Sequence, residues 1–205
     1  MSQAATGHVD VDTYQNPLTP ESWSKLAMWI FLAGDAMSFG ALLAVYGAFR
    51  LGSPNWPLPS SVLGVQLTGL MTFLLICSSV TMVKGLAAIQ DGDQAGLRKF
   101  LAFTIGGGVL FLLLQAYEWN HLIHEGMLLT TNPWGATQFG TTFYMTTGFH
   151  GCHVFGGVVY LSFVLAKALR GGYSATEFNG VETVGLYWHF VDLVWILVFT
   201  FVYLL

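Results

Sequence analysis

The sequence predicts an all-α integral membrane protein: a five-helix transmembrane bundle with its N-terminus in the cytoplasm and its C-terminus on the outer face. Three observations predict this class. Of the 205 residues, 54% are hydrophobic and only 9% are charged, whereas a soluble domain carries about 25% charged residues. The apolar residues gather in five stretches, each long enough to cross a bilayer. The basic residues gather at one side of the membrane when these stretches are threaded through it.

The five stretches follow one another in order, after a polar N-terminal tail at residues 1–22. Residues 23–205 then form one five-helix membrane domain. The spans are expected at residues 24–49, 62–87, 97–123, 139–168 and 181–205. Three prolines in LGSPNWPLPS end the first span, because proline interrupts a helix. QDGDQAG, TTNPWGATQ and RGGYSATEFNG are polar, contain glycine, and make the other connections.

The basic residues set the orientation. With the N-terminus inside, six of the seven lie at or near cytoplasmic ends, and only Arg50 lies outside. The positive-inside rule therefore places the N-terminus in the cytoplasm, and five spans bring the C-terminus to the outer face. The six cytoplasmic residues are Lys25, Lys84, Arg98, Lys99, Lys167 and Arg170.

Small residues and cysteines in the spans are interpreted as packing residues. Gly106–Gly107–Gly108 in the third span and Gly148, Gly151, Gly156 and Gly157 in the fourth allow helix backbones to approach closely. Cys77 and Cys152 each lie in an apolar run with no CxxC motif, so they too are interpreted as packing residues. The net charge of −4 provides no surface for nucleic acid.

Three acids and three histidines of the spans meet within one small bundle, which makes them the candidate site residues. On insertion scales, a charge at mid-bilayer costs about 2.5–3.5 kcal/mol, so each should face protein, a paired group, water or a lipid head group. At the helical rise per residue, Asp35 would lie roughly 15 Å deep. The set is Asp35, Glu118, His150, His153, His189 and Asp192.

Several roles for these groups can be weighed from spacing alone. His150 and His153 share one helix face, so one helix cannot place both as axial ligands on opposite sides of a haem. EWNH supplies one Glu-x-x-His, but a di-iron site needs two. We expect histidines that hydrogen-bond to neighbours or to Asp35 and Asp192, although ligation across helices, as in a b-haem anchor of a quinone-linked dehydrogenase, remains the alternative. A complete proton channel is not expected, because only Glu182 and Asp35 lie between the cytoplasmic surface and the middle of the membrane.

Taken together, the segments resemble subunit III of the haem-copper respiratory oxidases, over about residues 23–205. WIFLAGDAMSFGALLAVY is similar to the family's helix with a mid-membrane carboxylate, here Asp35. SSVTMVKG and LLLQAYEW resemble the next two helices, and the second of these motifs places Glu118. FGTTFYMTTGFHGCHVFGG and YWHFVDLVW match the last two helices and carry the remaining four candidate residues.

The resemblance implies a non-catalytic subunit of a proton-pumping terminal oxidase in the bacterial inner membrane. It implies no catalytic residue, metal or cofactor in this chain, with haems and copper in the partner subunits I and II. It also implies bound phospholipid in a V-shaped cleft, and contact with subunit I near a proton-uptake path. The sequence leaves open whether cytochrome c or quinol donates electrons, and whether the complex joins a respiratory supercomplex.

Two departures from the family's pattern matter. Seven-helix members have an N-terminal helix pair that this sequence lacks, so a partner would have to complete the lipid cleft. Asp35 stands where the family usually has glutamate, and its side chain is one methylene shorter. Asp35 then has two candidate roles: a hydrogen-bonding group that holds the first span in place, or a group that exchanges protons with the uptake path.

Overall fold

The computed structural model describes residues 22–205, and in that range it is entirely helical. The long helices are α1 (Trp23–Gly52), α3 (Val65–Gln90), α4 (Gln94–His124), α5 (Thr137–Leu169) and α6 (Asn179–Val198). A single turn, α2 (Pro59–Val62), precedes α3, and α6 continues into a π-helical segment, η2 (Phe199–Leu204). With η2 counted as the end of α6, five helices are long and apolar enough to span a membrane. The predicted all-α class and its five spans are confirmed, and the orientation of the termini stays a prediction. Residues 1–21 of the predicted polar tail lie outside the described residues.

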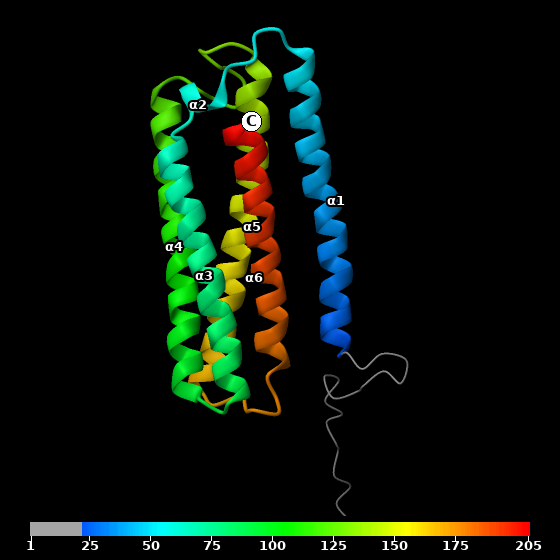
Figure 1. The fold of residues 1–205 in the computed structure, drawn as a ribbon, viewed down its shortest axis with the longest axis vertical. Helices are drawn as coiled ribbons and strands as arrows, with labels where there is room; N and C mark the ends of the chain where they lie inside the picture. Colours follow the sequence, from blue (N-terminus) through cyan, green and yellow to red (C-terminus); the bar gives the residue numbers. More distant parts are fainter. Residues whose placement is uncertain (1–21) are drawn as a thin grey trace, which may run out of the picture.

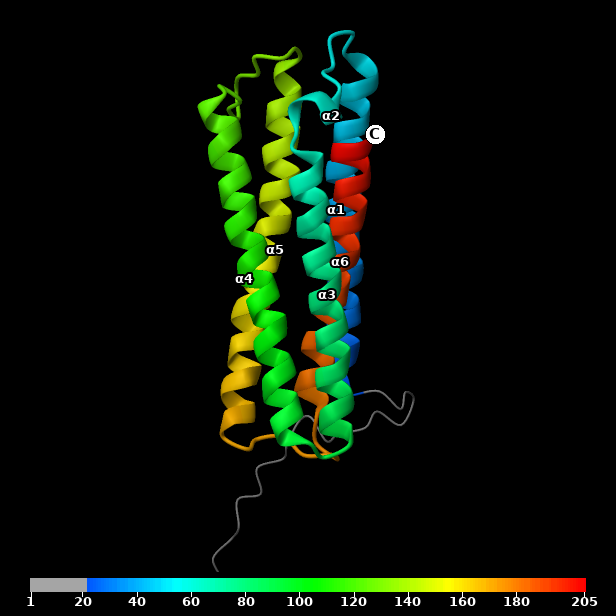
Figure 2. The same cartoon turned by 60° about the vertical axis from the view of Figure 1, so that its left-hand side comes forward.

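The helices run along one common axis, and α1 lies at the edge of the bundle (Figures 1 and 2). It packs mainly against α5 and α6. Its buried side chains, Leu32, Asp35, Phe39 and Tyr46, recur at three, four and seven residues and so form one narrow stripe. Most of the remaining surface of α1 is apolar and exposed, as expected for a helix that faces lipid or a partner subunit.

Local signals explain where several helices begin and end. The Ser22 side chain caps α1 by accepting a hydrogen bond from the Lys25 backbone amide, at 3.4 Å. Asp93 caps α4 in the same way through the amide of Gly96, at 2.9 Å. Between α3 and α4 the chain reverses in three residues, because Gly92 adopts a left-handed φ of 79°.

Close packing by small residues is confirmed at the centre of the bundle. The Trp188 indole of α6 lies between α4 and α5. A Cβ atom at Gly108 would lie 2.6 Å from its ring, and one at Gly157 would lie 2.8 Å from it. Gly106 has open space around it, so the packing interpretation does not extend to that residue.

The interpretation of the cysteines was wrong: Cys77 and Cys152 are both exposed on the outside of this chain.

The loop between α5 and α6 is held against the helix ends by Tyr173. The Gln94 side chain donates a hydrogen bond to the Tyr173 carbonyl at 2.6 Å, and Lys167 Nζ lies 4.8 Å from the centre of the Tyr173 ring. Burial, with a smaller contribution from Tyr160, raises the pKa of Tyr173 to about 12. The phenol is therefore neutral at physiological pH.

The basic residues are distributed as the orientation argument requires. Arg50 lies in the last turn of α1, at the end of the bundle that also holds the C-terminus (Figure 1). The other six lie at or near the opposite end, at the start of α1 and α4 and at the end of α3 and α5.

Candidate functional site

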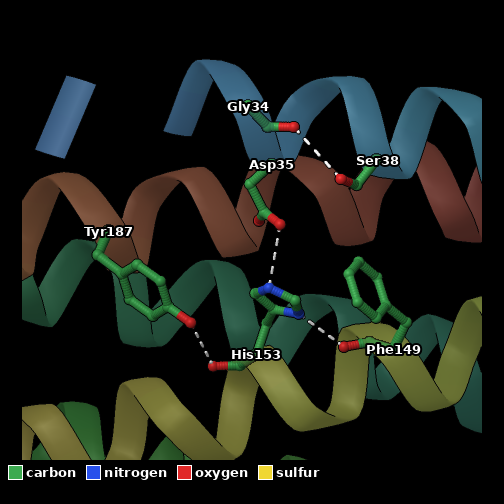
Figure 3. Close-up of polar contacts among 6 residues, drawn as sticks. All are labelled: Gly34, Asp35, Ser38, Phe149, His153 and Tyr187. Atoms are coloured by element: carbon green, nitrogen blue, oxygen red, sulfur yellow. Dashed lines mark hydrogen bonds and ion pairs between the residues drawn. The ribbon is translucent and has the colours of Figure 1, made fainter. Parts of the chain in front are cut away.

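Asp35 of α1 faces His153 of α5 across the helix interface (Figure 3). The Asp35 Oδ1 atom lies 3.1 Å from His153 Nε2, and the two side chains are 8% and 15% exposed. Phe39 and Phe149 pack their rings against the imidazole, with centroid separations of 5.2 and 4.6 Å. The contact therefore links α1 to α5 in largely apolar surroundings, where a hydrogen bond competes little with water.

The other ring nitrogen of His153 fixes where its protons lie. His153 Nδ1 is 2.7 Å from the carbonyl oxygen of Phe149, one turn earlier in α5. A carbonyl oxygen can only accept, so Nδ1 must carry a hydrogen. In a neutral imidazole Nε2 is then an acceptor, and Asp35 must donate to it. If the imidazole is charged, Nε2 donates to the carboxylate. In both states a single proton lies between the two side chains, and the pair carries no net charge.

Glu118 of α4 lies in a separate polar cluster nearer the end of the bundle that holds the C-terminus. It is 3% exposed, and each carboxylate oxygen has its own donor. Thr68 Oγ1 of α3 donates to Oε1 and Tyr203 Oη of η2 donates to Oε2, both at 2.9 Å. Glu118 thus joins three helical segments, and the π-helical geometry of η2 accompanies the inward position of Tyr203.

His189 and Asp192 of α6 meet α3 at a third location. His189 Nδ1 lies 2.6 Å from Ser79 Oγ, and Asp192 also hydrogen-bonds the Ser79 side chain. His189 and Asp192 therefore both contact Ser79. A hydrogen bond between a histidine and Asp192 was one of the expected arrangements, but His189 contacts the serine instead. Two tryptophans of α6 fix this face of the helix: Trp188 donates to Ser78 Oγ at 3.0 Å, and Trp195 donates to Thr72 Oγ1 at 2.9 Å.

His150 departs from the expectation that the buried histidines are hydrogen-bonded. It is fully buried, and neither ring nitrogen has a partner among the described residues. Its ring lies 4.8 Å from Trp195 and 5.7 Å from Phe111, measured between centroids. His150 therefore fills an aromatic layer between α4, α5 and α6.

The candidate residues lie in three polar clusters and one isolated position. Within residues 22–205, no group of three or more His, Cys, Asp and Glu side chains could hold a metal ion. His121, on the last turn of α4, lies 3.3 Å from Glu125 at the surface and belongs to none of these clusters.

Comparison with known proteins identifies the family. The family model for cytochrome c oxidase subunit III matches residues 22–205. The chain belongs to the cytochrome c oxidase subunit III family. A Synechocystis protein named cytochrome c oxidase subunit 3 is 43% identical over 86% of this chain and 73% of its own length. Similar proteins from Nocardia farcinica and Thermostichus vulcanus are each 36% identical over 85% and 88% of this chain, and over 84% and 86% of their own lengths.

Membership in this family settles the class of function. Subunit III is a non-catalytic part of a haem-copper oxidase complex, and the family lacks redox cofactors. With five apolar helices, the chain is a multi-pass membrane protein. The alternative function as a b-haem anchor of a dehydrogenase is not supported.

The structure also adds polar partners that sequence reasoning did not find for the candidate residues. Thr68, Ser79 and Tyr203 each contact a candidate residue through a side-chain oxygen. They lie 50, 110 and 85 residues away along the chain from their partners. A hydroxyl within an apolar span is an available signal, but by itself it does not indicate which carboxylate or imidazole the hydroxyl reaches.

Proposed function

We propose that this chain supports a proton-pumping terminal oxidase that passes electrons from cytochrome c to dioxygen and forms water. In this proposal it lies in a bacterial inner membrane against subunits I and II, which hold the haems and copper. It supports assembly, phospholipid binding, proton uptake and lasting turnover of the catalytic subunit. The family match supports the assignment to the complex, and the six basic residues near one end of the bundle support a cytoplasmic N-terminus.

The pair Asp35–His153 carries the proposal for this chain's own contribution. Apart from apolar packing, α1 needs a specific contact that sets its position on α5, and this pair provides one at 3.1 Å. Because the pair is neutral as a unit, it avoids most of the cost of an isolated charge in the membrane. Asp35 therefore acts as a structural lock, which keeps the subunit in the form that the catalytic subunit requires.

Replacing Asp35 separates the structural role from a proton-exchange role. In Asp35→Asn, the amide can donate to a neutral His153 Nε2, so the hydrogen bond survives although residue 35 cannot titrate. We expect this variant to assemble normally and to keep wild-type oxygen consumption from about pH 6 to pH 8.5. Asp35→Ala leaves His153 Nε2 without its partner, which typically costs about 1–3 kcal/mol, so we expect reduced recovery of the complex.

Ser38→Ala is the matched control. Ser38 lies one turn after Asp35, is exposed, and donates only to the Gly34 carbonyl of its own helix at 3.3 Å (Figure 3). Its loss should affect neither assembly nor oxygen consumption. If Asp35→Asn assembles fully but loses activity increasingly as pH rises, residue 35 exchanges protons and the structural proposal is wrong.

A further inference from the structure

One nitrogen of His189 reaches the surface of the chain in the middle of the membrane. His189 lies about 15 Å along α6 from Asn179, where this helix begins. Its imidazole is only partly buried, and Nε2 is not enclosed and has no hydrogen-bond partner among residues 22–205. The surrounding surface is apolar, since Leu193 of α6 and Val80 of α3 are both exposed. A polar atom is therefore presented at a depth where lipid offers it no partner.

The other ring nitrogen is held by Ser79 of the neighbouring helix α3, which packs beside α6 (Figure 2). His189 Nδ1 lies 2.6 Å from Ser79 Oγ, and Asp192 hydrogen-bonds the same hydroxyl. A serine hydroxyl has one hydrogen, so it can donate to only one of these two groups and must accept from the other. The serine therefore links the protons of Asp192 to those of His189.

Two arrangements of protons keep these three residues neutral overall and place the serine hydrogen in a bond. In the first, a protonated Asp192 donates to Ser79 and Ser79 donates to Nδ1, so the neutral imidazole carries its hydrogen on Nε2. In the second, an imidazolium donates from Nδ1 to Ser79, Ser79 donates to an ionised Asp192, and Nε2 again carries a hydrogen. A bare Nε2 requires either a net charge at this depth or a serine hydrogen without an acceptor, and both are costly.

A hydrogen on Nε2 needs an acceptor, and the depth of His189 limits which molecule can bring one. Acyl chains contain no acceptor, and the ester and phosphate oxygens of a phospholipid lie about 15 Å away, at the edge of the hydrocarbon core. Polar side chains at mid-membrane depth bond across the interfaces between helices. An acceptor side chain on a membrane-spanning helix therefore fits both the depth and the chemistry of this position.

We propose that Asp192 and Ser79 hold His189 with a hydrogen on Nε2, and that this donor binds an acceptor side chain on a transmembrane helix of a neighbouring oxidase subunit. The exposed side chains of Val80, Leu193 and Ile196 pack against that helix. Ser79 is a positioning residue, because it acts through the imidazole. The inference rests on the proposed function only for the presence of neighbouring subunits.

Nitrogen-15 NMR of the purified complex, prepared with labelled histidine, tests where the hydrogen lies. His189→Gln identifies the His189 resonances by their absence, and we expect the wild-type Nε2 to carry a hydrogen. Ser79→Ala should convert His189 to a mixture of tautomers, whereas Ser79→Thr keeps a hydroxyl and should retain the wild-type pattern. Ser162→Ala is the matched control, because Ser162 is exposed and donates only to the Val158 carbonyl of its own helix, at 2.7 Å.

Release of this chain from the complex by increasing detergent tests the partner. His189→Leu removes the donor, so we expect it to weaken association about threefold, the usual effect of one hydrogen bond between membrane helices. His189→Gln should associate like the wild type, because its amide nitrogen can take the place of Nε2. A photocrosslinking amino acid at Leu193 should join this chain to another subunit of the complex.

Each part of the inference can fail by itself. A bare Nε2 in the wild type, or an unchanged pattern in Ser79→Ala, would overturn the role of Asp192 and Ser79. Equal association of His189→Leu and the wild type, or a crosslink from Leu193 to lipid alone, would overturn the docking of a helix. None of these measurements depends on turnover, so co-purification with subunits I and II and oxygen consumption test the proposed function separately.

Discussion

At the scale of single residues, the two buried acids Asp35 and Glu118 are satisfied in different ways. Glu118 receives two neutral donors, one for each oxygen, whereas Asp35 has one titratable partner and an Oδ2 atom without any partner among the described residues. The two acids therefore differ in which substitutions of their partners they should tolerate. Glu118 requires two hydroxyls at once, and Asp35 requires only one group that can share a proton or donate one.

The histidines should prove independent of the oxidase haems. We expect His150→Ala, His153→Ala and His189→Ala to leave the haem content per purified complex unchanged, as measured from the optical spectrum. Recovery of the complex should fall most for His153→Ala, because that change removes the partner of Asp35 at a buried site. His121→Ala is the control, since its side chain is 65% exposed. Selective loss of one haem in any of the three variants would restore the ligand hypothesis.

The sequence could place the candidate residues by depth, because a fixed rise per residue converts position into height. A hydrogen bond from a histidine to Asp35 was one of the arrangements expected from the sequence, and the structure shows that His153 makes this contact. The sequence could not predict that His150 lacks a partner, because that depends on aromatic rings from two other helices filling the space around it. Local sequence patterns also could not predict partners such as Ser79, because these partners lie on helices far away in the sequence.

At the scale of helices, Trp188 depends on two glycines to lie between α4 and α5. The same indole donates to Ser78 of α3, so one side chain of α6 contacts α3, α4 and α5. Five spans were predictable because each is a long apolar run. The π-helical geometry of η2 was not, because its sequence is as apolar as the α-helix before it and has no distinguishing period.

Gly108 and Gly106 give a direct test of this packing. In Gly108→Ala, the new methyl group would lie 2.6 Å from Trp188 and 2.7 Å from Val158, so we expect the stability to fall by about 1–3 kcal/mol. Gly106→Ala meets nothing within 4 Å and should be neutral or stabilising by about 0.5–1 kcal/mol. Thermal unfolding of the purified complex, followed by tryptophan fluorescence, compares the two. Equal midpoints for both variants would show that the indole has room to move.

At the scale of the whole molecule, the ends of the bundle differ in charge and in composition. Six basic residues lie at or near one end, and Arg50 lies at the other, beside the C-terminal segment. The sequence predicted this grouping because the positive-inside rule needs only the order of spans and loops. The position of α1 at the edge, packed mainly on α5 and α6, required the structure.

Single cysteines test the orientation in intact cells. One is placed in the loop at residues 90–96 and another after Leu205, with Cys77 and Cys152 replaced by serine, because both are exposed on this chain. We expect an impermeant thiol reagent to label only the C-terminal cysteine. Labelling of the 90–96 loop from outside would contradict a cytoplasmic N-terminus.

The edge position of α1 also affects when its contacts can form during synthesis of the chain. Helix α1 is synthesised first, yet both helices that hold it, α5 and α6, are synthesised last. More than a hundred residues separate Asp35 from His153, so at about 5–20 residues per second the aspartate is made on the order of ten seconds before its partner. During that interval α1 lacks the two helices against which it packs, and Asp35 lacks His153. We therefore expect the membrane insertion machinery, or an early-binding subunit, to retain α1 until α5 and α6 have been synthesised.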